Sequence, residues 1–251
     1  MINAAFHLHT MQVPPAEGKQ TIPIRRLLSQ LYSERVRLPV ITNKNSVSDV
    51  KGAREVAARL GMFVPYATEA RTRGDIEVIA VFDRMDSDIE KSIRTAGRYD
   101  CKEFIRYVKS EGGKTILPHP YLKRCGIAHL EGEAAVEELC RDGLVDGIEW
   151  NLQMDNVLMR RKNGKAWDLL DSVNKKYGLK IPLVFGNDSY FGDVGVLMQI
   201  KADNPEDALE KMFESGFSPL FVKRPMPLPY YLGKHLYTSL AYEPKGTLGL
   251  I

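Results

Sequence analysis

Two histidines near the amino terminus stand at alternate positions. His7 and His9 end a short apolar segment that begins at Ala4 and that we expect to form a strand. Side chains two residues apart along a strand point to the same face of a sheet, so both imidazoles can reach one cation. A single histidine at such a place is explained equally well by hydrogen bonds in a protein core. The pair therefore indicates metal binding only if further ligands arrive from other strands.

Three more residues of ligand type follow predicted strands elsewhere in the chain. Glu69 ends the segment MFVPYATE, His119 ends TILPH, and Asp188 follows IPLVF in the sequence GND. Carboxylates and imidazoles are costly to bury unless they are paired, hydrogen-bonded or bound to a metal. Because the carboxyl ends of parallel strands meet at one face of an α/β fold, we expect these side chains to converge with the two histidines on a cation.

The elements that would position these residues are short apolar runs alternating with longer amphipathic segments. We expect strands at residues 4–9, 38–42, 62–68, 77–82, 115–118, 147–149 and 181–185. We expect helices at residues 23–34, 48–60, 86–95, 101–111, 131–141, 165–177 and 205–216. This alternation predicts repeated βα units around a parallel sheet or barrel. Residues 223–251, rich in Pro, Tyr and Lys, show no such period, and we expect an arm packed on a barrel of residues 1–222.

The composition is that of an ordinary globular protein. The chain has 251 residues, 44% of them hydrophobic and 27% charged, which fits one domain with one core. A formal net charge of +3 is too small to imply a nucleic-acid or membrane partner. The three cysteines lack metal-type spacing, and the sequence shows neither a secretory leader nor a run of about 18 apolar residues. We therefore expect a cytoplasmic protein with reduced cysteines.

The order of the motifs resembles one known family. The chain contains, in sequence, FHLHT, VITNKNSV, VPYATEA, ILPHP, GIEWN, GNDSY and ADNPEDALEKMFESG. This order is similar to that of the PHP (polymerase and histidinol phosphatase) metal-dependent phosphoesterases, and the similarity extends over roughly residues 1 to 222. The resemblance implies a distorted (β/α)7-type barrel whose carboxyl face holds divalent ions for phosphoester hydrolysis.

The resemblance also implies which residues hold the ions. One site would consist of His7, His9, Glu69 and Asp188. Glu69 would bridge to a second site, completed by His119 and by Glu77, which stands where many relatives have a histidine. Carboxylate can replace imidazole as a ligand of Mn, Fe or Zn. Two divalent ions are therefore expected.

The chain departs from the family pattern where three-ion relatives hold a third cation. Thr42, Asn43 and Lys44 stand in place of the sequence TDH, and Tyr190 replaces a histidine two residues after the aspartate. Ala5 replaces an aspartate ahead of the first histidine. The ammonium of Lys44 could occupy the space of the missing ion and supply its charge, or Lys44 could be an exposed loop lysine. Tyr190 could protonate a leaving group, or could be only a hydrogen-bonding residue at the rim.

Four basic residues come shortly after strands that carry expected ligands. They are Arg71, Arg73, Lys123 and Arg124. Guanidinium and ammonium groups donate charge-assisted hydrogen bonds to phosphate, so these side chains could hold the part of a substrate that does not react. The alternative is that each is a solvated loop charge.

Three functions are compatible with these features. The first is a metal-dependent phosphoesterase that hydrolyses a small phosphomonoester or a nucleotide-type phosphodiester with a metal-activated water. The second is a catalytically weakened barrel that binds a phosphorylated ligand or a protein partner, which Asn43, Lys44 and Tyr190 favour. The third is a nucleic-acid-processing nuclease, favoured by the basic and aromatic residues of the arm. The sequence gives no oligomeric state and no membrane partner.

Overall fold

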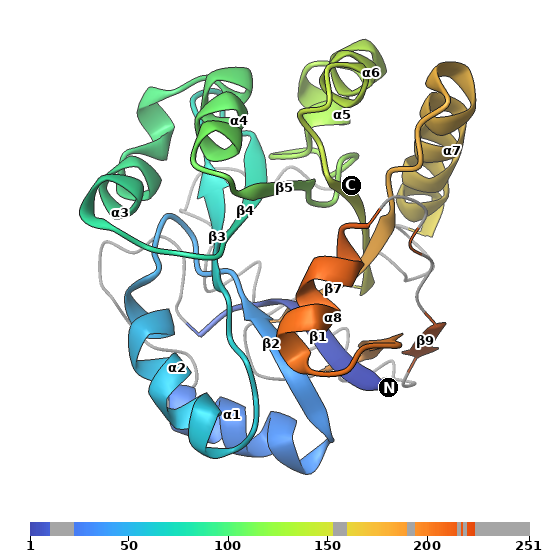
Figure 1. The fold of residues 1–251 in the computed structure, drawn as a ribbon. Helices are drawn as coiled ribbons and strands as arrows, with labels where there is room; N and C mark the ends of the chain where they lie inside the picture. Colours follow the sequence, from blue (N-terminus) through green and yellow to red (C-terminus); the bar gives the residue numbers. More distant parts are fainter. Residues whose placement is uncertain (11–22, 153–159, 190–193, 215–216, 218–219, 224–251) are drawn as a thin grey trace, which may run out of the picture.

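The computed structural model describes residues 1–10, 23–152, 160–189, 194–214, 217 and 220–223, and its path is drawn in Figure 1. Nine strands form one sheet. They are β1 (Ile2–Leu8), β2 (Val36–Ile41), β3 (Tyr66–Arg71), β4 (Glu77–Phe82), β5 (Lys114–Leu117), β6 (Gly147–Asn151), β7 (Leu183–Ser189), β8 (Val196–Ile200) and β9 (Leu220–Lys223). In the described part of the chain, no helix has both the length and the apolar character needed to cross a membrane.

The sheet curves into a nearly closed barrel. Its strand order is β3-β4-β5-β6-β7-β1-β8-β9. Strand β2 also pairs with β1 but lies off this path. Among the described residues, β2 and β3 share no ladder, and a single parallel bridge between Lys44 and Glu69 joins the wall at that seam. Strands β5, β6, β7, β1 and β2 run parallel, as repeated βα units require. The predicted α/β barrel is confirmed.

Helices surround the strands on the outside of the barrel, as Figure 1 shows. They are α1 (Ile24–Ser33), α2 (Ser48–Arg59), α3 (Ser87–Arg94), α4 (Cys101–Ser110), α5 (Ile127–Leu130), α6 (Glu133–Arg141), α7 (Arg160–Tyr177) and α8 (Pro205–Met212). Their starts follow from local chemistry. Asp100 and Glu103 form a capping box at α4, and Asn204 caps α8 ahead of Pro205.

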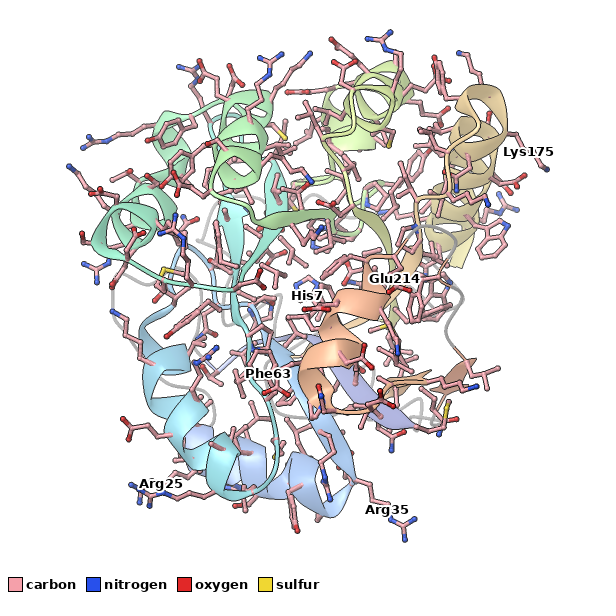
Figure 2. The ribbon with its side chains drawn as sticks, viewed as in Figure 1. His7, Arg25, Arg35, Phe63, Lys175 and Glu214 are labelled. Atoms are coloured by element: carbon pink, nitrogen blue, oxygen red, sulfur yellow. The ribbon has the colours of Figure 1, made fainter. Side chains whose placement is uncertain are left out.

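The apolar faces of these helices and strands make the core. Phe6 of β1 and Phe104 of α4 are fully buried in a large cluster that extends across most of the barrel. A second cluster lies between β1, β2, α1 and α2 and includes Leu27 and Leu31. Arg25, Arg35 and Lys175 project from the outside of the molecule in Figure 2, whereas His7 lies near the middle of the ring of strands. The interior of the barrel therefore holds ionisable groups.

Strand β4 departs from the expected parallel arrangement. It runs antiparallel to both β3 and β5. Only Thr72–Ile76 connects β3 to β4, and a turn this short closes a hairpin and excludes a parallel crossover. Gly74 and Asp75 adopt the left-handed backbone conformation that the turn requires. As a result β4 starts, and does not end, at the face where the parallel strands end.

Other differences concern the edges of the predicted elements. Strand β3 begins at Tyr66, later than the predicted start at residue 62, and β8, β9 and the short helix α5 are not predicted. Strand β9 pairs with β8 and includes Lys223, so an element of the sheet crosses the predicted boundary between barrel and arm. Residues 224–251 of the predicted arm lie outside the described residues.

Candidate metal centre

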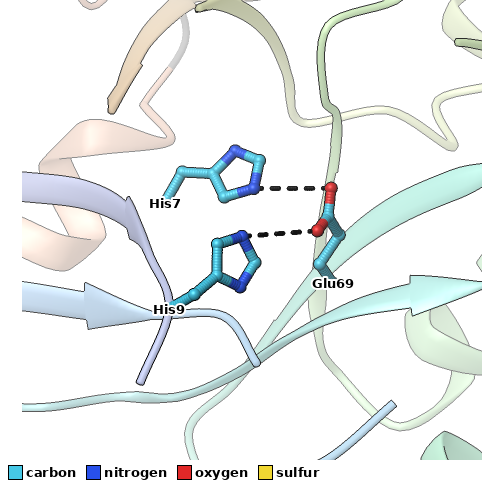
Figure 3. Close-up of side chains that lie close together, drawn as sticks. All are labelled: His7, His9 and Glu69. Carbon is cyan, nitrogen blue, oxygen red and sulfur yellow. Dashed lines mark ion pairs between the residues drawn. The ribbon is translucent and has the colours of Figure 1, made fainter. Parts of the chain in front are cut away.

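His7 and His9 lie at the carboxyl end of β1 and face one carboxylate. His7 Nε2 is 3.4 Å from Glu69 Oε1, and His9 Nε2 is 3.5 Å from Glu69 Oε2 (Figure 3). The strand is irregular here, because its register shifts between Phe6 and Leu8 against β7. The two rings nonetheless lie with their centroids 5.0 Å apart. The expected pairing of the two imidazoles on one side is therefore present, on a bulged strand.

Asp188 closes the same group from β7. Its Oδ1 atom is 3.7 Å from His7 Nε2 and 3.4 Å from His9 Nε2. With Glu69, these side chains place imidazole nitrogens and carboxylate oxygens around one point inside the barrel. The structure thus brings together all four residues that the sequence assigns to a first ion.

His119 contacts both Glu69 and Glu77, next to the first group of ligands. His119 Nε2 is 3.0 Å from Glu69 Oε1 and 3.4 Å from Glu77 Oε2. His119 comes just after β5, whereas Glu77 is the first residue of β4. Because β4 is antiparallel to its neighbours, its start reaches the same face as their ends. Glu69 therefore contacts members of both expected groups of ligands.

Three of these residues have a backbone conformation that side chains disfavour. The φ angles of His7, His119 and Asp188 are +61°, +26° and +46°. Positive φ at a residue other than glycine costs about 1–3 kcal/mol and persists only where the surrounding structure imposes it. Such strain gathers at functional sites. Its occurrence at three expected ligands agrees with a functional role for this face of the barrel.

The side chains fit a divalent cation. Two groups, His7 with His9 and Glu69, and His7 with His119 and Asp188, each bring ligand atoms within 4.8 Å of one another. The buried atom His7 Nε2 has no hydrogen-bond partner among the described residues. A buried polar atom without a partner is costly unless something else satisfies it. Imidazole nitrogen and carboxylate oxygen are the ligands that Zn, Mn and Fe take in proteins.

Glu149 of β6 orients His7 from behind. Its Oε1 lies 2.6 Å from His7 Nδ1, and its Oε2 accepts hydrogen bonds from the His119 backbone N–H (2.9 Å) and from Asn151 Nδ2 (3.1 Å). A carboxylate on Nδ1 favours the tautomer that leaves Nε2 available to a metal. Sequence alone does not distinguish a supporting or packing role of Glu149 from direct chemistry. A glutamate between the apolar residues Ile148 and Trp150, at the end of a predicted strand, is the signal that could have identified it.

Lys44 enters the site on the side of Glu77. Its Nζ lies 2.7 Å from Glu69 Oε2 and contacts Glu77 Oε1, and only 12% of its side chain is exposed. That burial does not agree with an exposed loop lysine. Burial raises the pKa of Glu69, whereas the charges of Lys44 and His7 hold the pKa of that carboxyl well below its usual range. Lys44 thus shares the carboxylates of the expected second ion, whereas the sequence suggested the place of a third.

No family model matches the sequence. The uncharacterized protein MJ1587 of Methanocaldococcus jannaschii is 25% identical over 134 residues, which are 51% of this chain and 73% of that protein. This similarity covers half of the chain and names no activity.

Solved structures resemble the barrel over most of its length. PsfC from Pseudomonas syringae PB-5123 has a TM-score of 0.60 at 13% identity and covers 96% of this chain and 98% of its own. A two-domain protein from Bacteroides vulgatus contains a predicted PHP-like metal-dependent phosphoesterase. Its TM-score is 0.60 at 15% sequence identity, and the match covers 89% of this chain and 65% of that protein. A candidate metal-dependent phosphoesterase from Bifidobacterium adolescentis has a TM-score of 0.57 at 14% sequence identity. The match covers 86% of this chain and 96% of that protein. The fold is PHP-like.

In this PHP-like barrel, Cys125 lies beside the second group of ligands. Its Sγ is 3.9 Å from His119 Nδ1, and Glu77, His119 and Cys125 together bring ligand atoms within 4.8 Å. The Cys125 carbonyl also accepts a hydrogen bond from the Glu77 backbone N–H (3.0 Å). The sequence assigned no cysteine to the site. Five residues of loop lie between His119 and Cys125, and no spacing rule links the two.

The predicted substrate-binding residues differ in their distance from the centre of the candidate site. Arg71 lies at its edge, with Nε 3.6 Å from Glu77 Oε1. Arg73 pairs on the surface with Asp100 at 3.7 Å, and 64% of its side chain is exposed. Lys123 and Arg124 are exposed in the segment between β5 and α5. Tyr190, the predicted proton donor, lies outside the described residues.

The protonation state of His7 predicts how the affinity for a metal depends on pH. Burial lowers the pKa of His7, but the carboxylates of Glu149, Glu69 and Asp188 raise it, and the result is a pKa of about 10. A cation needs the neutral imidazole, so at pH below 10 its binding must displace that proton. We expect the apparent affinity for Mn²⁺ to rise about tenfold between pH 6.5 and 7.5. Calorimetric titrations in two buffers of different ionisation enthalpy measure the released proton, and binding without proton release would contradict this assignment.

Proposed function

We propose that the protein is a divalent-metal-dependent phosphoesterase of the PHP type, which hydrolyses a small phosphomonoester or a nucleotide-type phosphodiester. The observation that carries the proposal is the convergence of His7, His9, Glu69 and Asp188 from three strands on one buried point. A chain that did not bind a metal would gain nothing from burying imidazoles and carboxylates face to face, since each is costly to desolvate. The PHP-like fold and its phosphoesterase neighbours support the same reaction class.

The chain's own residues would prepare the site in distinct ways. A bound divalent cation lowers the pKa of a water molecule and neutralises phosphoryl oxygens. Glu149 holds the His7 ring so that Nε2 faces the centre. The ammonium of Lys44 and the guanidinium of Arg71 place positive charge at the edge, where a phosphate anion would be attracted. We further propose Tyr190 as donor of a proton to the leaving group.

One observation favours the second function, a barrel that binds a phosphorylated ligand without hydrolysing it. Lys44 neutralises Glu69 and Glu77, and a site with fewer bound cations than expected has less charge available for catalysis. The third function, a nuclease, depends on residues 223–251 as a nucleic-acid contact, and all but one of these lie outside the described residues.

The deciding experiment compares metal content with hydrolysis. The protein is purified without chelators, its metals are counted per chain, and a phosphomonoester and a single-stranded oligonucleotide are assayed with added Mn²⁺. We expect the double variant His7→Ala, His9→Ala to lose both metal and hydrolysis. His129→Ala is the matched control, because His129 is exposed on α5, and it should keep both.

Three results separate the functions. Metal and hydrolysis lost together in the double variant support the phosphoesterase. Hydrolysis that survives in the double variant contradicts it, since the activity would then come from another site or a contaminant. Metal that is bound by the wild-type protein, with no hydrolysis of either substrate, favours the binding function.

A further inference from the structure

The position of Lys44 is set by the barrel wall. The chain after β2 runs beside β3, where the Asn45 backbone N–H donates to the Glu69 carbonyl (3.1 Å) and Thr68 Oγ1 donates to the Asn43 carbonyl (2.8 Å). The bridge between Lys44 and Glu69 belongs to the same contact. Asn45 Oδ1 also accepts a hydrogen bond from the Arg71 backbone N–H (2.8 Å). The backbone of Lys44 is thereby fixed next to the carboxylate that its ammonium contacts.

The ammonium lies between the two carboxylates of the second group of ligands. Its Nζ contacts both Glu69 Oε2 and Glu77 Oε1, and Glu77 has Arg71 as an additional basic neighbour at 3.6 Å. These carboxylate charges are the ones that a second divalent cation would need. An ammonium is a compact charge with three N–H donors, and a dication placed on the same oxygen atoms would be repelled by it.

The first group of ligands is not occupied in this way. His7 Nε2 lies within 3.7 Å of both Glu69 Oε1 and Asp188 Oδ1, whereas the ammonium of Lys44 contacts Glu69 Oε2. Glu69 Oε1 faces His7, and Glu69 Oε2 is shared, because it is 3.5 Å from His9 Nε2 and 2.7 Å from Lys44 Nζ. Glu69 is therefore placed to contact both a cation held with His7 and His9 and the ammonium of Lys44.

We propose that this protein binds a single divalent cation, held by His7, His9, Glu69 and Asp188, and that the Lys44 ammonium takes the place of a second cation. The inference rests on the proposed function and narrows it: a phosphoryl group would meet one dication and one fixed monocation. It also differs from the two ions that the sequence predicts. Lys44 would then be a residue that sets the metal stoichiometry.

The test is to count ions with and without the ammonium. The metal-free protein is saturated with Mn²⁺, and the bound ions per chain are counted by elemental analysis. We expect one ion per wild-type chain and two in Lys44→Met, which keeps the length of the side chain and removes its charge. Lys51→Met is the matched control and should bind one, because Lys51 lies on the surface and pairs with Glu90 at 2.8 Å.

Electron paramagnetic resonance gives a second readout that needs no variant. An isolated Mn²⁺ in the wild-type protein supports the inference, whereas a spin-coupled pair overturns it. A folded Lys44→Met protein that still binds one ion overturns it as well, and Lys44→Gln replaces this variant if it does not fold. Hydrolysis is assayed in parallel. A wild-type protein with one ion and no hydrolysis contradicts the proposed function alone, and hydrolysis with two ions contradicts this inference alone.

Discussion

Glu69→Gln is expected to remove the bound metal and to lower phosphoester hydrolysis roughly 10³-fold, which corresponds to a loss of several kcal/mol of transition-state stabilisation. Glu69 is the residue on which the site converges, because its two carboxylate oxygens face His7, His9 and Lys44. Glutamine keeps the shape of the side chain but carries no charge, and one of its two oxygens becomes an amide nitrogen, which cannot ligate a cation.

The measurement is the Mn²⁺ bound per chain by equilibrium dialysis, together with the initial rate on a phosphomonoester. Glu137→Gln is the matched control, because Glu137 makes an exposed ion pair with Lys176 at 2.8 Å on the outside of the barrel. Such a pair contributes about 0–1 kcal/mol, so this variant should keep both metal and activity. If Glu69→Gln keeps its metal and its rate, the centre does not lie at Glu69.

Gly186→Ala is expected to destabilise the protein and to weaken its metal site from a position that is not itself a ligand. Gly186 lies in β7 opposite Phe6 of β1 and Asn151 of β6. A Cβ atom there would overlap the Glu149 carboxylate, with its Cδ only 2.6 Å away. Glu149 is fully buried and hydrogen-bonded to His7, so it cannot withdraw without releasing the imidazole.

Overpacking of this kind costs about 1–3 kcal/mol, which should lower the melting temperature of a chain of this size by roughly 2–12 °C. Loss of the group that orients a metal-binding histidine weakens metal binding by roughly 10- to 100-fold. Thermal unfolding and Mn²⁺ titration measure the two effects.

Gly52→Ala supplies the control for the same chemical change. Gly52 is exposed within α2, and a Cβ there would meet nothing within 4 Å. Alanine stabilises a helix interior by about 1 kcal/mol relative to glycine, so this variant should melt slightly higher and bind metal unchanged. Gly186→Ala with wild-type stability and affinity would mean that Glu149 has more room than its contacts indicate.

The barrel and the proximity of the first group of expected ligands could be predicted because each depends on a local pattern. Alternating apolar and amphipathic segments specify the βα rhythm, and His9, Glu69 and Asp188 stand at or near strand ends that any parallel barrel brings together. The prediction for the first histidine pair assumed a regular strand. In the structure the two histidines face the same carboxylate because the strand is irregular at His7. The sequence does not predict this irregularity.

The remaining features depend on contacts between distant segments. The reversed direction of β4 decides that Glu77 reaches the site, and it follows from the short turn at Gly74, a signal that the sequence contains. Lys44, by contrast, could not be assigned to a particular ion, because its place depends on how the chain after β2 runs along β3. Cys125 approaches His119 only through the fold of a loop, and no periodicity reveals that contact.

The contact between β2 and β3 makes this part of the barrel more sensitive to insertions than the outer surface. Elsewhere neighbouring strands are held by ladders of hydrogen bonds, but here the wall is completed by residues 42–45, and one of them carries the ammonium of the site. An insertion into the chain between Ile41 and Ser48 would therefore both open the barrel wall and misplace the ammonium of Lys44. Insertions of equal length between the outer helices would do neither, so new surface features could be added there while the chemistry stays intact.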